Sequence, residues 1–393
     1  MKKLAIVITH PIQYYAPWFK LLAIRGNLEL KVFYTWSQAA HTVKDKTFGR
    51  DIKWDVPLLE GYNYEFVDNE SKKPGSHHFF GIDCPNLIPN LKAYTPDAIL
   101  FFGWNFKSHL KAMRYFHGKI PVWFRGDSTL LDEIGGAKTM LRRLVLKKVY
   151  TYVDKAFYVG QANKAYFLKH GLRDNQLIHA PHAVNNAHFY DNSNHDYEKG
   201  AKLWKRDLAI PEDQITVVFA GKFENKKQPN LLVNAVIAAN KIREKPLALI
   251  MIGNGPLEQN LKSMIHGVSY IRFLPFQNQS KMPLVYRMAS IFCLPSQGPG
   301  ETWGLAINEA MASERPVIVT DKVGGAKDML IEGYNGYGFY HSSQEELVAI
   351  LENLSLNDLK LMGSNAREHV EKFTMCHIVE ALENELLNVD KSS

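Results

Sequence analysis

The sequence has few cysteines and no hydrophobic run long enough to cross a membrane. Its three cysteines, Cys84, Cys293 and Cys376, are far apart and lack the spacing of metal ligands. This sparse usage favours a reducing compartment over a disulfide-stabilised secreted fold. The first apolar run stops at Thr9-His10-Pro11, short of a signal-peptide core and of the ~18 apolar residues that span a bilayer. We therefore expect a cytoplasmic protein.

Motifs of several other function classes are also missing. No helix-turn-helix, zinc-finger or RNA-binding signature is present, so we expect no nucleic-acid partner. No Asp-x-Asp pair is present to hold a metal–diphosphate complex. With 46% hydrophobic and 22% charged residues, the composition is typical of a soluble globular protein. A length of 393 residues indicates two domains.

Positive charge is concentrated in the first half of the chain. Residues 1–190 hold 26 lysines and arginines against 15 acidic residues, whereas the remainder holds 21 against 25. This asymmetry predicts an anionic partner for the first half, either a phosphorylated acceptor or an anionic lipid surface. A basic amphipathic helix is expected over residues 138–155. It either packs on its own sheet or docks at the inner face of the cell membrane as a peripheral contact.

Short β-rich runs alternate with helical stretches, which is the pattern of parallel sheets with crossover helices. The expected strands are Leu4–Thr9, Leu30–Tyr34, Ala98–Gly103, Pro121–Arg125, Ala156–Val159, Ile215–Gly221, Leu247–Ile252, Tyr270–Leu274, Ile291–Leu294 and Pro316–Thr320. We expect an α/β fold of two doubly wound, Rossmann-like domains facing across a cleft, with ligand sites at the carboxyl ends of the strands. The expected domains are residues 1–190 and 191–372. A C-terminal helix over 373–393 is expected to cross back to the first domain, and residues 185–202 read as the interdomain linker.

Two carboxylates bracket a predicted strand-to-helix junction in the second half. Glu301 follows a loop broken by proline and glycine. Seven residues separate it from Glu309, which lies on a helix with a buried face. The first turn of such a helix exposes N–H groups and the positive end of its dipole, which suits a diphosphate. The junction residues expected at this donor site are Gly300, Thr302, Trp303, Gly304 and Leu305.

Cations and glycines follow other strands of the same half. Lys222 and Lys227 come after one strand and are candidates for phosphate oxygens, although such lysines are often only solvated. Gly253-Asn254-Gly255-Pro256 ends the next strand, and Gly324-Gly325 opens a further helix; each is also compatible with a plain turn. Together with the segment from Glu301 to Glu309, these three elements make four, each at the end of a strand, and they predict one ligand site.

In order and spacing, these motifs resemble the donor domain of family 4 glycosyltransferases, which have the GT-B fold. The matching segments are Gly221-Lys222-Phe223, Gly253-Asn254-Gly255-Pro256, Leu294-Pro295-Ser296, Glu301 to Glu309, Gly324-Gly325 and Gly333-Tyr334-Asn335-Gly336. The resemblance is strong over residues 213–340 and looser in the first half.

The resemblance implies a role for each matched residue. Glu301 would contact hydroxyls of the donor sugar, Glu309 would hold the ribose, and Lys222 with Lys227 would neutralise the diphosphate. It also implies a retaining reaction with neither metal nor cofactor. Fixed cations and a helix N-terminus would stabilise the charge on the leaving diphosphate instead.

Two pairs of residues in the first half, each after a predicted strand, are candidates for the same reaction. Arg125 and Asp127 follow a predicted strand and are expected to face the donor sugar or acceptor, with a simple turn as the alternative. His10 and Gln13 follow the first strand and would face the diphosphate or acceptor, with a capping or core role as the alternative.

The sequence predicts transfer from a nucleoside diphosphate sugar, UDP-linked, to a saccharide or lipid-linked acceptor in bacterial surface polysaccharide or glycolipid synthesis. A glycosidase would need its carboxylates within about 5–9.5 Å. Eight helical residues rise roughly 12 Å, which argues against one. Two other readings stay open, a nucleotide-sugar epimerase or hydrolase and a non-catalytic nucleotide-sugar-binding subunit. There is also a structural alternative, in which Glu301 and Glu309 are only helix-end and surface charges.

Overall fold

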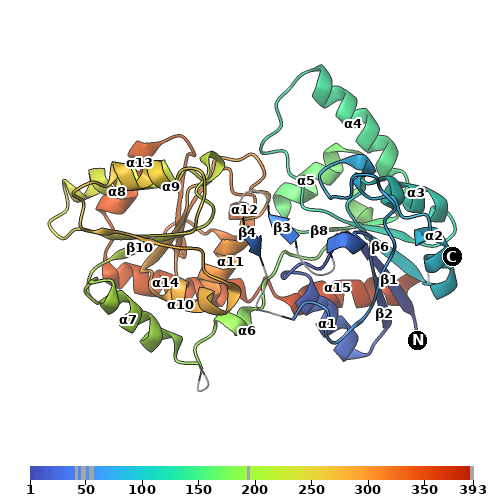
Figure 1. Ribbon diagram of the computed structural model, residues 1–393, viewed down its shortest axis with the longest axis horizontal. Helices are drawn as coiled ribbons and strands as arrows, with labels where there is room; N and C mark the ends of the chain where they lie inside the picture. Colours follow the sequence, from blue (N-terminus) through green and yellow to red (C-terminus); the bar gives the residue numbers. More distant parts are fainter. Residues whose placement is uncertain (40–42, 46–49, 53–56, 193–194, 390–393) are drawn as a thin grey trace. The chain divides into compact units, whose positions relative to one another are not determined.

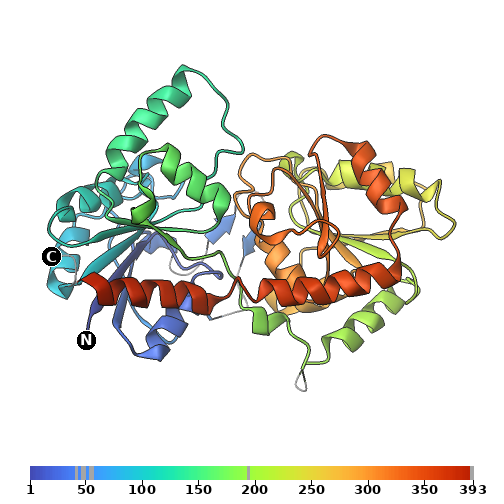
Figure 2. The same cartoon turned by 180° about the vertical axis from the view of Figure 1, so that it is seen from behind.

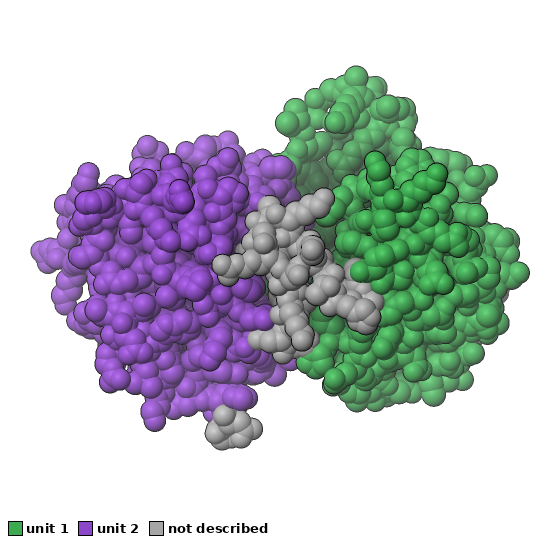
Figure 3. Space-filling view, viewed as in Figure 1, with its two compact units in different colours: residues 1–44, 51–182, 374–393 green, residues 45–50, 183–373 purple. Residues whose placement is uncertain are grey.

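The computed structural model describes residues 1–39, 43–45, 50–52, 57–192 and 195–389. The chain divides into two compact units (Figure 3). The first unit comprises residues 1–44, 51–182 and 374–393, and the second comprises residues 45–50 and 183–373. The main boundary, between 182 and 183, thus precedes the position expected from the sequence.

The first unit is built on a seven-stranded parallel sheet in the order β5-β2-β1-β6-β7-β8-β9 (Figure 1). Its strands are β1 (Lys3–Ile8), β2 (Glu29–Tyr34), β5 (Asn63–Phe66), β6 (Ala98–Phe102), β7 (Val122–Arg125), β8 (Lys155–Tyr158) and β9 (Leu177–His179). The order turns back beside β1, since β2 and β6 flank it. Such a switch point forms a crevice at the carboxyl ends of the strands.

The second unit contains a six-stranded parallel sheet in the order β12-β11-β10-β13-β14-β15. Its strands are β10 (Thr216–Ala220), β11 (Ala248–Ile252), β12 (Ile271–Leu274), β13 (Ile291–Leu294), β14 (Val317–Thr320) and β15 (Gly336–Phe339). The order reverses beside β10, between β11 and β13. The predicted α/β architecture of two doubly wound sheets is confirmed.

All ten strands expected from the sequence are present, and five others were missed. Three of these, β5, β9 and β15, lie at sheet edges. An edge strand is covered less completely and therefore lacks the continuous apolar run that marks a central strand. The other two, β3 (Val43–Asp45) and β4 (Arg50–Ile52), pair only with each other in a separate two-stranded sheet.

Helices cover both faces of each sheet. In the first unit they are α1 (Ala16–Arg25), α2 (Leu87–Tyr94), α3 (Lys107–Phe116), α4 (Ala137–Tyr150), α5 (Gln161–Lys169) and α15 (Met375–Asn388). In the second unit they are α6 (Asn186–Phe189), α7 (Tyr197–Asp207), α8 (Pro229–Asn240), α9 (Glu258–Met264), α10 (Met282–Arg287), α11 (Leu305–Ala312), α12 (Ala326–Met329), α13 (Gln344–Glu352) and α14 (Leu356–Val370). Among the residues described, no helix is both long and apolar enough to cross a membrane.

The segment 185–202, expected to be the interdomain linker, lies within the second unit. This segment contains α6 and the first turns of α7. The Asp196 side chain caps α7 by accepting a hydrogen bond of 3.0 Å from the Lys199 N–H. The polar composition that indicated a linker therefore reflects a capped helix with a mostly exposed surface.

The last helix, α15, belongs to the first unit although it follows the second unit in the chain. It packs beside α1 (Figures 1 and 2). Ile378, Val379, Leu382 and Leu386 form its buried stripe, and the Glu383 carboxylate accepts a hydrogen bond of 2.9 Å from Arg25 of α1. The contact joins the two ends of the chain through both apolar packing and an ion pair.

Replacing Leu382 by alanine is expected to destabilise the protein by about 2–5 kcal/mol, because it leaves a cavity between α15 and α1. The free energy of unfolding in urea measures the effect. Leu387→Ala is the matched control, since Leu387 lies on the exposed side of the same helix. Equal unfolding midpoints for the two variants would contradict this packing.

Candidate functional site

The loop between β13 and α11 is held by a close backbone contact. The N–H of Gly324 donates to the Glu301 carbonyl at 3.0 Å, and that of Gly325 donates to the Trp303 carbonyl at 2.8 Å. A Cβ atom at residue 324 would lie 1.8 Å from the Thr302 carbonyl oxygen. Only glycine permits this approach, so the paired glycines serve to hold the segment that carries Glu301.

Glu301 and Lys227, both expected at the donor site, form an ion pair. Lys227 lies on a short 3₁₀ turn, Asn225–Lys227, after β10. The loop after β13 is tied to this turn, because the Gln297 N–H donates to the Lys226 carbonyl at 2.9 Å. The same Glu301 carboxylate accepts a hydrogen bond of 2.8 Å from the buried Ser296 hydroxyl. Glu301 is thereby oriented by one charged and one neutral partner.

Glu309 lies in a different environment, on the interior of α11. It is 3% exposed and accepts hydrogen bonds from the Tyr286 hydroxyl at 2.6 Å and from the Gln279 amide at 3.0 Å. A carboxylate is costly to bury without such donors. The alternative that both glutamates are surface charges is wrong, since Glu309 is buried and only 13% of the Glu301 side chain is exposed.

The remaining residues expected at the donor site fall into two groups. Gly300, Thr302, Leu305 and Lys222 lie in the loops or the first turn at this edge of the sheet. Trp303 and Gly253 instead support it from within. The Trp303 ring is buried against Phe373 and its indole N–H donates to Asn308 at 2.7 Å, so its side chain does not face a ligand. A Cβ at residue 253 would lie 1.9 Å from the Gly221 carbonyl oxygen, so this glycine allows two loops to pack.

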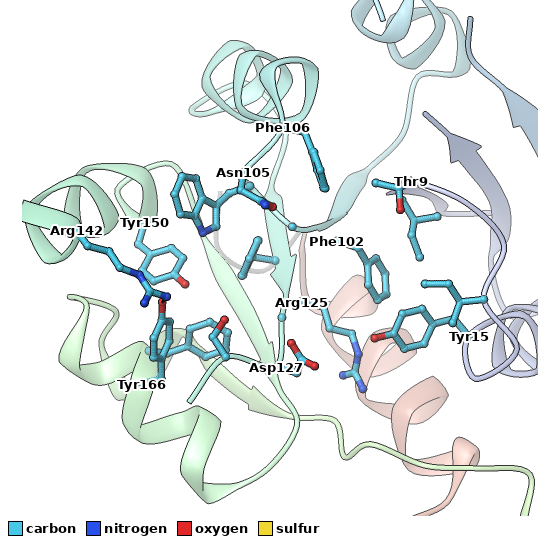
Figure 4. Close-up of a pocket in the computed structure, with 18 residues that line it drawn as sticks. Thr9, Tyr15, Phe102, Asn105, Phe106, Arg125, Asp127, Arg142, Tyr150 and Tyr166 are labelled. Carbon is cyan, nitrogen blue, oxygen red and sulfur yellow. Dashed lines mark hydrogen bonds between the residues drawn. The ribbon is translucent and has the colours of Figure 1, made fainter. Parts of the chain in front are cut away.

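The first unit contains a separate pocket of about 340 Å³ at the carboxyl ends of β1, β6 and β7 (Figure 4). Arg125 and Asp127 both line it, as the sequence predicts for a site at this edge. The other walls are aromatic and include Tyr15, Phe102 and Tyr166. A pocket with aromatic walls and a few polar groups suits a sugar or another partly apolar acceptor.

Buried cationic and neutral groups surround Asp127 in this pocket. The Arg125 guanidinium donates to the carbonyls of Ala180 at 2.7 Å and Pro181 at 3.1 Å, and burial lowers its pKa to about 10. His182 Nε2 lies 3.9 Å from the Asp127 carboxylate. Burial lowers the pKa of His182, while the hydrogen bond with Asp127 opposes this shift. Burial, followed by the Asp127 charge, raises the pKa of Tyr15, whose ring is parallel to that of His182.

His10 and Gln13 are not among the residues that line this pocket. The His10 ring packs edge-on against Trp36 at 5.4 Å between centroids, and its Nδ1 lies 2.9 Å from the Thr9 hydroxyl. Burial lowers the pKa of His10 to about 4, which keeps the ring neutral near pH 7. Gln13 Oε1 is buried without a hydrogen-bond partner among the described residues.

Several site residues were missed from the sequence. Ser296 falls within the matched Leu294-Pro295-Ser296 motif and was therefore within reach, but Gln279 and Tyr286 carry no local signal. In the first unit, Tyr15 and His182 are likewise brought to Asp127 only by the fold. Within the described parts of the chain, no three His, Cys, Asp or Glu side chains group closely enough to hold a metal ion.

Gly304→Ala is expected to destabilise the second unit more than Gly300→Ala, by about 1–3 kcal/mol from overpacking. Both glycines have a φ of 90°, so both substitutions introduce backbone strain. At Gly304 the added Cβ would also lie 2.7 Å from Val323 and 3.0 Å from Leu294, whereas at Gly300 it meets open space. Urea unfolding of the two variants measures the difference; similar losses would contradict tight packing at the start of α11.

Comparison with known proteins gives both a family and a fold. Residues 201–370 match the family model described as "Glycosyl transferases group 1". The D-inositol 3-phosphate glycosyltransferase of Streptomyces bingchenggensis is 32% identical over 181 residues, covering 42% of this chain and 39% of that protein. The enzyme of the same name from Gordonia bronchialis is 26% identical over 199 residues, covering 46% and 42%. The match therefore spans about two fifths of the length of these curated relatives.

Solved structures resemble the whole chain. The crystal structure of Anabaena Alr3699/HepE in complex with UDP and glucose matches with a TM-score of 0.69 and 18% identity, covering 99% of this chain and 100% of that chain. Sucrose-phosphate synthase from Thermosynechococcus elongatus matches with a TM-score of 0.71 and 15% identity, covering all of both chains. At these identities the likeness shows the fold alone. The chain therefore has the GT-B fold, and residues 201–370 of its second unit match the group 1 glycosyl transferases.

Proposed function

We propose that the protein is a retaining, metal-independent glycosyltransferase that uses a nucleoside diphosphate sugar. The bond between the anomeric carbon and the diphosphate oxygen breaks, and a new bond forms to the oxygen of an acceptor hydroxyl. The proton of that hydroxyl passes to the departing phosphate oxygen. Positive groups around the diphosphate stabilise the charge that develops on it.

The observation that carries the proposal is the Lys227–Glu301 ion pair, which lies just before the N-terminus of α11. A bound diphosphate would compete with Glu301 for Lys227, because both are anionic and the lysine is a single point charge. Release from Lys227 would leave the Glu301 carboxylate held by Ser296 and able to accept hydrogen bonds from sugar hydroxyls. Lys222 and the N-terminus of α11, with the residues from Thr302 to Gly304 that precede it, would add positive charge beside the phosphates.

Glu309 is proposed to hold the ribose. Each of its carboxylate oxygens already accepts one hydrogen bond, from Gln279 or from Tyr286. A carboxylate has about four lone-pair sites and can accept hydrogen bonds from several groups at once. The two existing contacts restrict the carboxylate to one orientation, which lowers the entropic cost of binding a nucleotide.

The acceptor is proposed to bind the first unit, where Arg125 and Asp127 line the aromatic pocket. His10 and Gln13 are proposed to contribute on the diphosphate or acceptor side. A UDP-sugar is the proposed donor, supported by a neighbour of the same fold that was solved with UDP and glucose. A saccharide or lipid-linked acceptor in bacterial surface polysaccharide or glycolipid synthesis fits this pocket and the basic first half of the chain, and would place the enzyme at the inner face of the cell membrane.

Glu301→Gln is expected to lower the rate of transfer by on the order of 10²-fold, as removal of one preorganised electrostatic contact does. Glutamine retains the shape and the contact with Ser296 but loses the charge. Product formation from a panel of UDP-sugars and lipid-linked acceptors, followed by mass spectrometry, measures the rate. UDP affinity, measured by calorimetry, should not fall, because the substitution also removes the anion that competes with the diphosphate for Lys227.

Glu314→Gln is the matched control, because Glu314 is exposed just beyond the other end of α11. Unchanged turnover in Glu301→Gln would refute the role of Glu301. Donor conversion without any acceptor would instead identify an epimerase or hydrolase. UDP binding with no turnover across the panel would identify a non-catalytic binding subunit.

Tyr286→Phe is expected to weaken UDP binding by about tenfold, because the Glu309 carboxylate loses a hydrogen bond that orients it. At saturating donor, kcat should remain near that of the wild type. Tyr270→Phe serves as the control, since Tyr270 immediately precedes β12, an edge strand of the same sheet, whereas Glu309 follows the central strand β13. An unchanged UDP affinity in Tyr286→Phe would remove the ribose role of Glu309.

A further inference from the structure

Helix α4 of the first unit has two apolar faces, of which only one is packed. The inner face buries Leu146, Val149 and Tyr150 in the core beneath the sheet. On the same side, Arg142 donates to the Tyr166 hydroxyl at 3.1 Å and lines the pocket that holds Asp127. These contacts fix the rotation of the helix about its own axis.

The outer face carries a continuous set of exposed apolar side chains. Met140, Leu141, Leu144 and Val145 are exposed, and Ile134 in the preceding loop is 83% exposed. The pairs 140/144 and 141/145 are four residues apart and therefore adjacent on one helical face. In Figures 1 and 2, α4 and the chain leading to it stand out from the body of the first unit. Most surface helices place charged residues on this side, so the apolar stripe marks a contact surface.

Basic side chains surround this stripe. The sequence of α4, AKTMLRRLVLKKVY, contains five lysines and arginines and no acidic residue. Lys138, Lys147 and Lys148 are exposed, while Arg143 is paired with Glu133. A helix with exposed apolar residues flanked by lysines is the pattern of helices that lie in a membrane interface.

We propose that the outer face of α4, with Ile134, docks on an anionic membrane surface. The apolar side chains would enter the boundary between headgroups and acyl chains, and the lysines would contact lipid phosphates. Charge argues against a second copy of the chain as the occupant. A symmetric dimer places the same patch on both sides, which would bring the lysines of two copies together.

This surface would also place the acceptor pocket near the lipid. The inner face of α4 forms one wall of the pocket through Arg142 and Tyr150, so docking of the outer face sets the pocket one helix diameter from the headgroups. A lipid-linked acceptor could then reach Asp127 without leaving the bilayer surface. The delivery of a lipid-linked acceptor to this pocket rests on the proposed function, whereas the contact of α4 with the membrane does not.

Co-sedimentation of the full chain with vesicles tests the contact. Binding is expected to phosphatidylcholine vesicles that contain about 30% phosphatidylglycerol, to be weaker without the anionic lipid, and to fall as NaCl is raised. Leu141→Ser/Leu144→Ser should lower the partition coefficient at least about tenfold, because it removes two apolar side chains from the contact. UDP affinity should remain that of the wild type, which separates this result from any failure of the donor site.

Ile242→Ser/Leu361→Ser is the matched control. These residues of the second unit are 69% and 65% exposed, against 63% for both Leu141 and Leu144. The control should bind vesicles as the wild type does. Equal loss in both double variants, or no binding of the wild type to anionic vesicles at low salt, would overturn the proposal. Concentration-dependent dimerisation that Leu141→Ser/Leu144→Ser abolishes, without vesicle binding, would assign the face to a second copy instead.

Discussion

The close backbone contact between residues 301–303 and 324–325 is the constraint on which the position of Glu301 and of the loop before α11 depends. Gly324 and Gly325 lie so near the opposing carbonyls that any side chain would displace the loop. The contact fixes the position of Glu301 and of Gly304, the residue that caps the start of α11. Because β13 and β14 are parallel neighbours, their carboxyl ends bring these two segments together without further support.

The two glutamates differ because the fold gives them different partners. Glu301 pairs with a lysine at the carboxyl ends of β10 and β13, where the proposed diphosphate would compete for that lysine. Glu309 is buried and held by two neutral donors, so its contacts orient the carboxylate without neutralising it. An exchangeable charge and a fixed acceptor on one helix-loop segment are compatible with a ligand that has a diphosphate and a polyol.

The first unit combines a pocket lined by polar and aromatic side chains with an unpacked helix face. Arg125 and His182 are buried, whereas 46% of the Asp127 side chain is exposed, so buried groups support a carboxylate that is open to the pocket. Across the same wall, α4 buries one apolar face and exposes another. A single helix therefore connects the aromatic pocket with a surface of exposed apolar side chains.

The sequence by itself determined ten of the strands, the two doubly wound sheets and the resemblance to a glycosyltransferase donor domain, because most of these strands are continuous apolar runs and the motifs fall at their ends. It also placed Glu301 and Lys227 at the carboxyl ends of strands of one sheet, although they lie 74 positions apart in the sequence. Only the tertiary structure paired them, buried Glu309 against Tyr286, and packed the side chains of α15 against α1. It also decided which face of α4 is exposed. These features depend on side-chain contacts between distant segments, which periodicity and spacing along the chain do not encode.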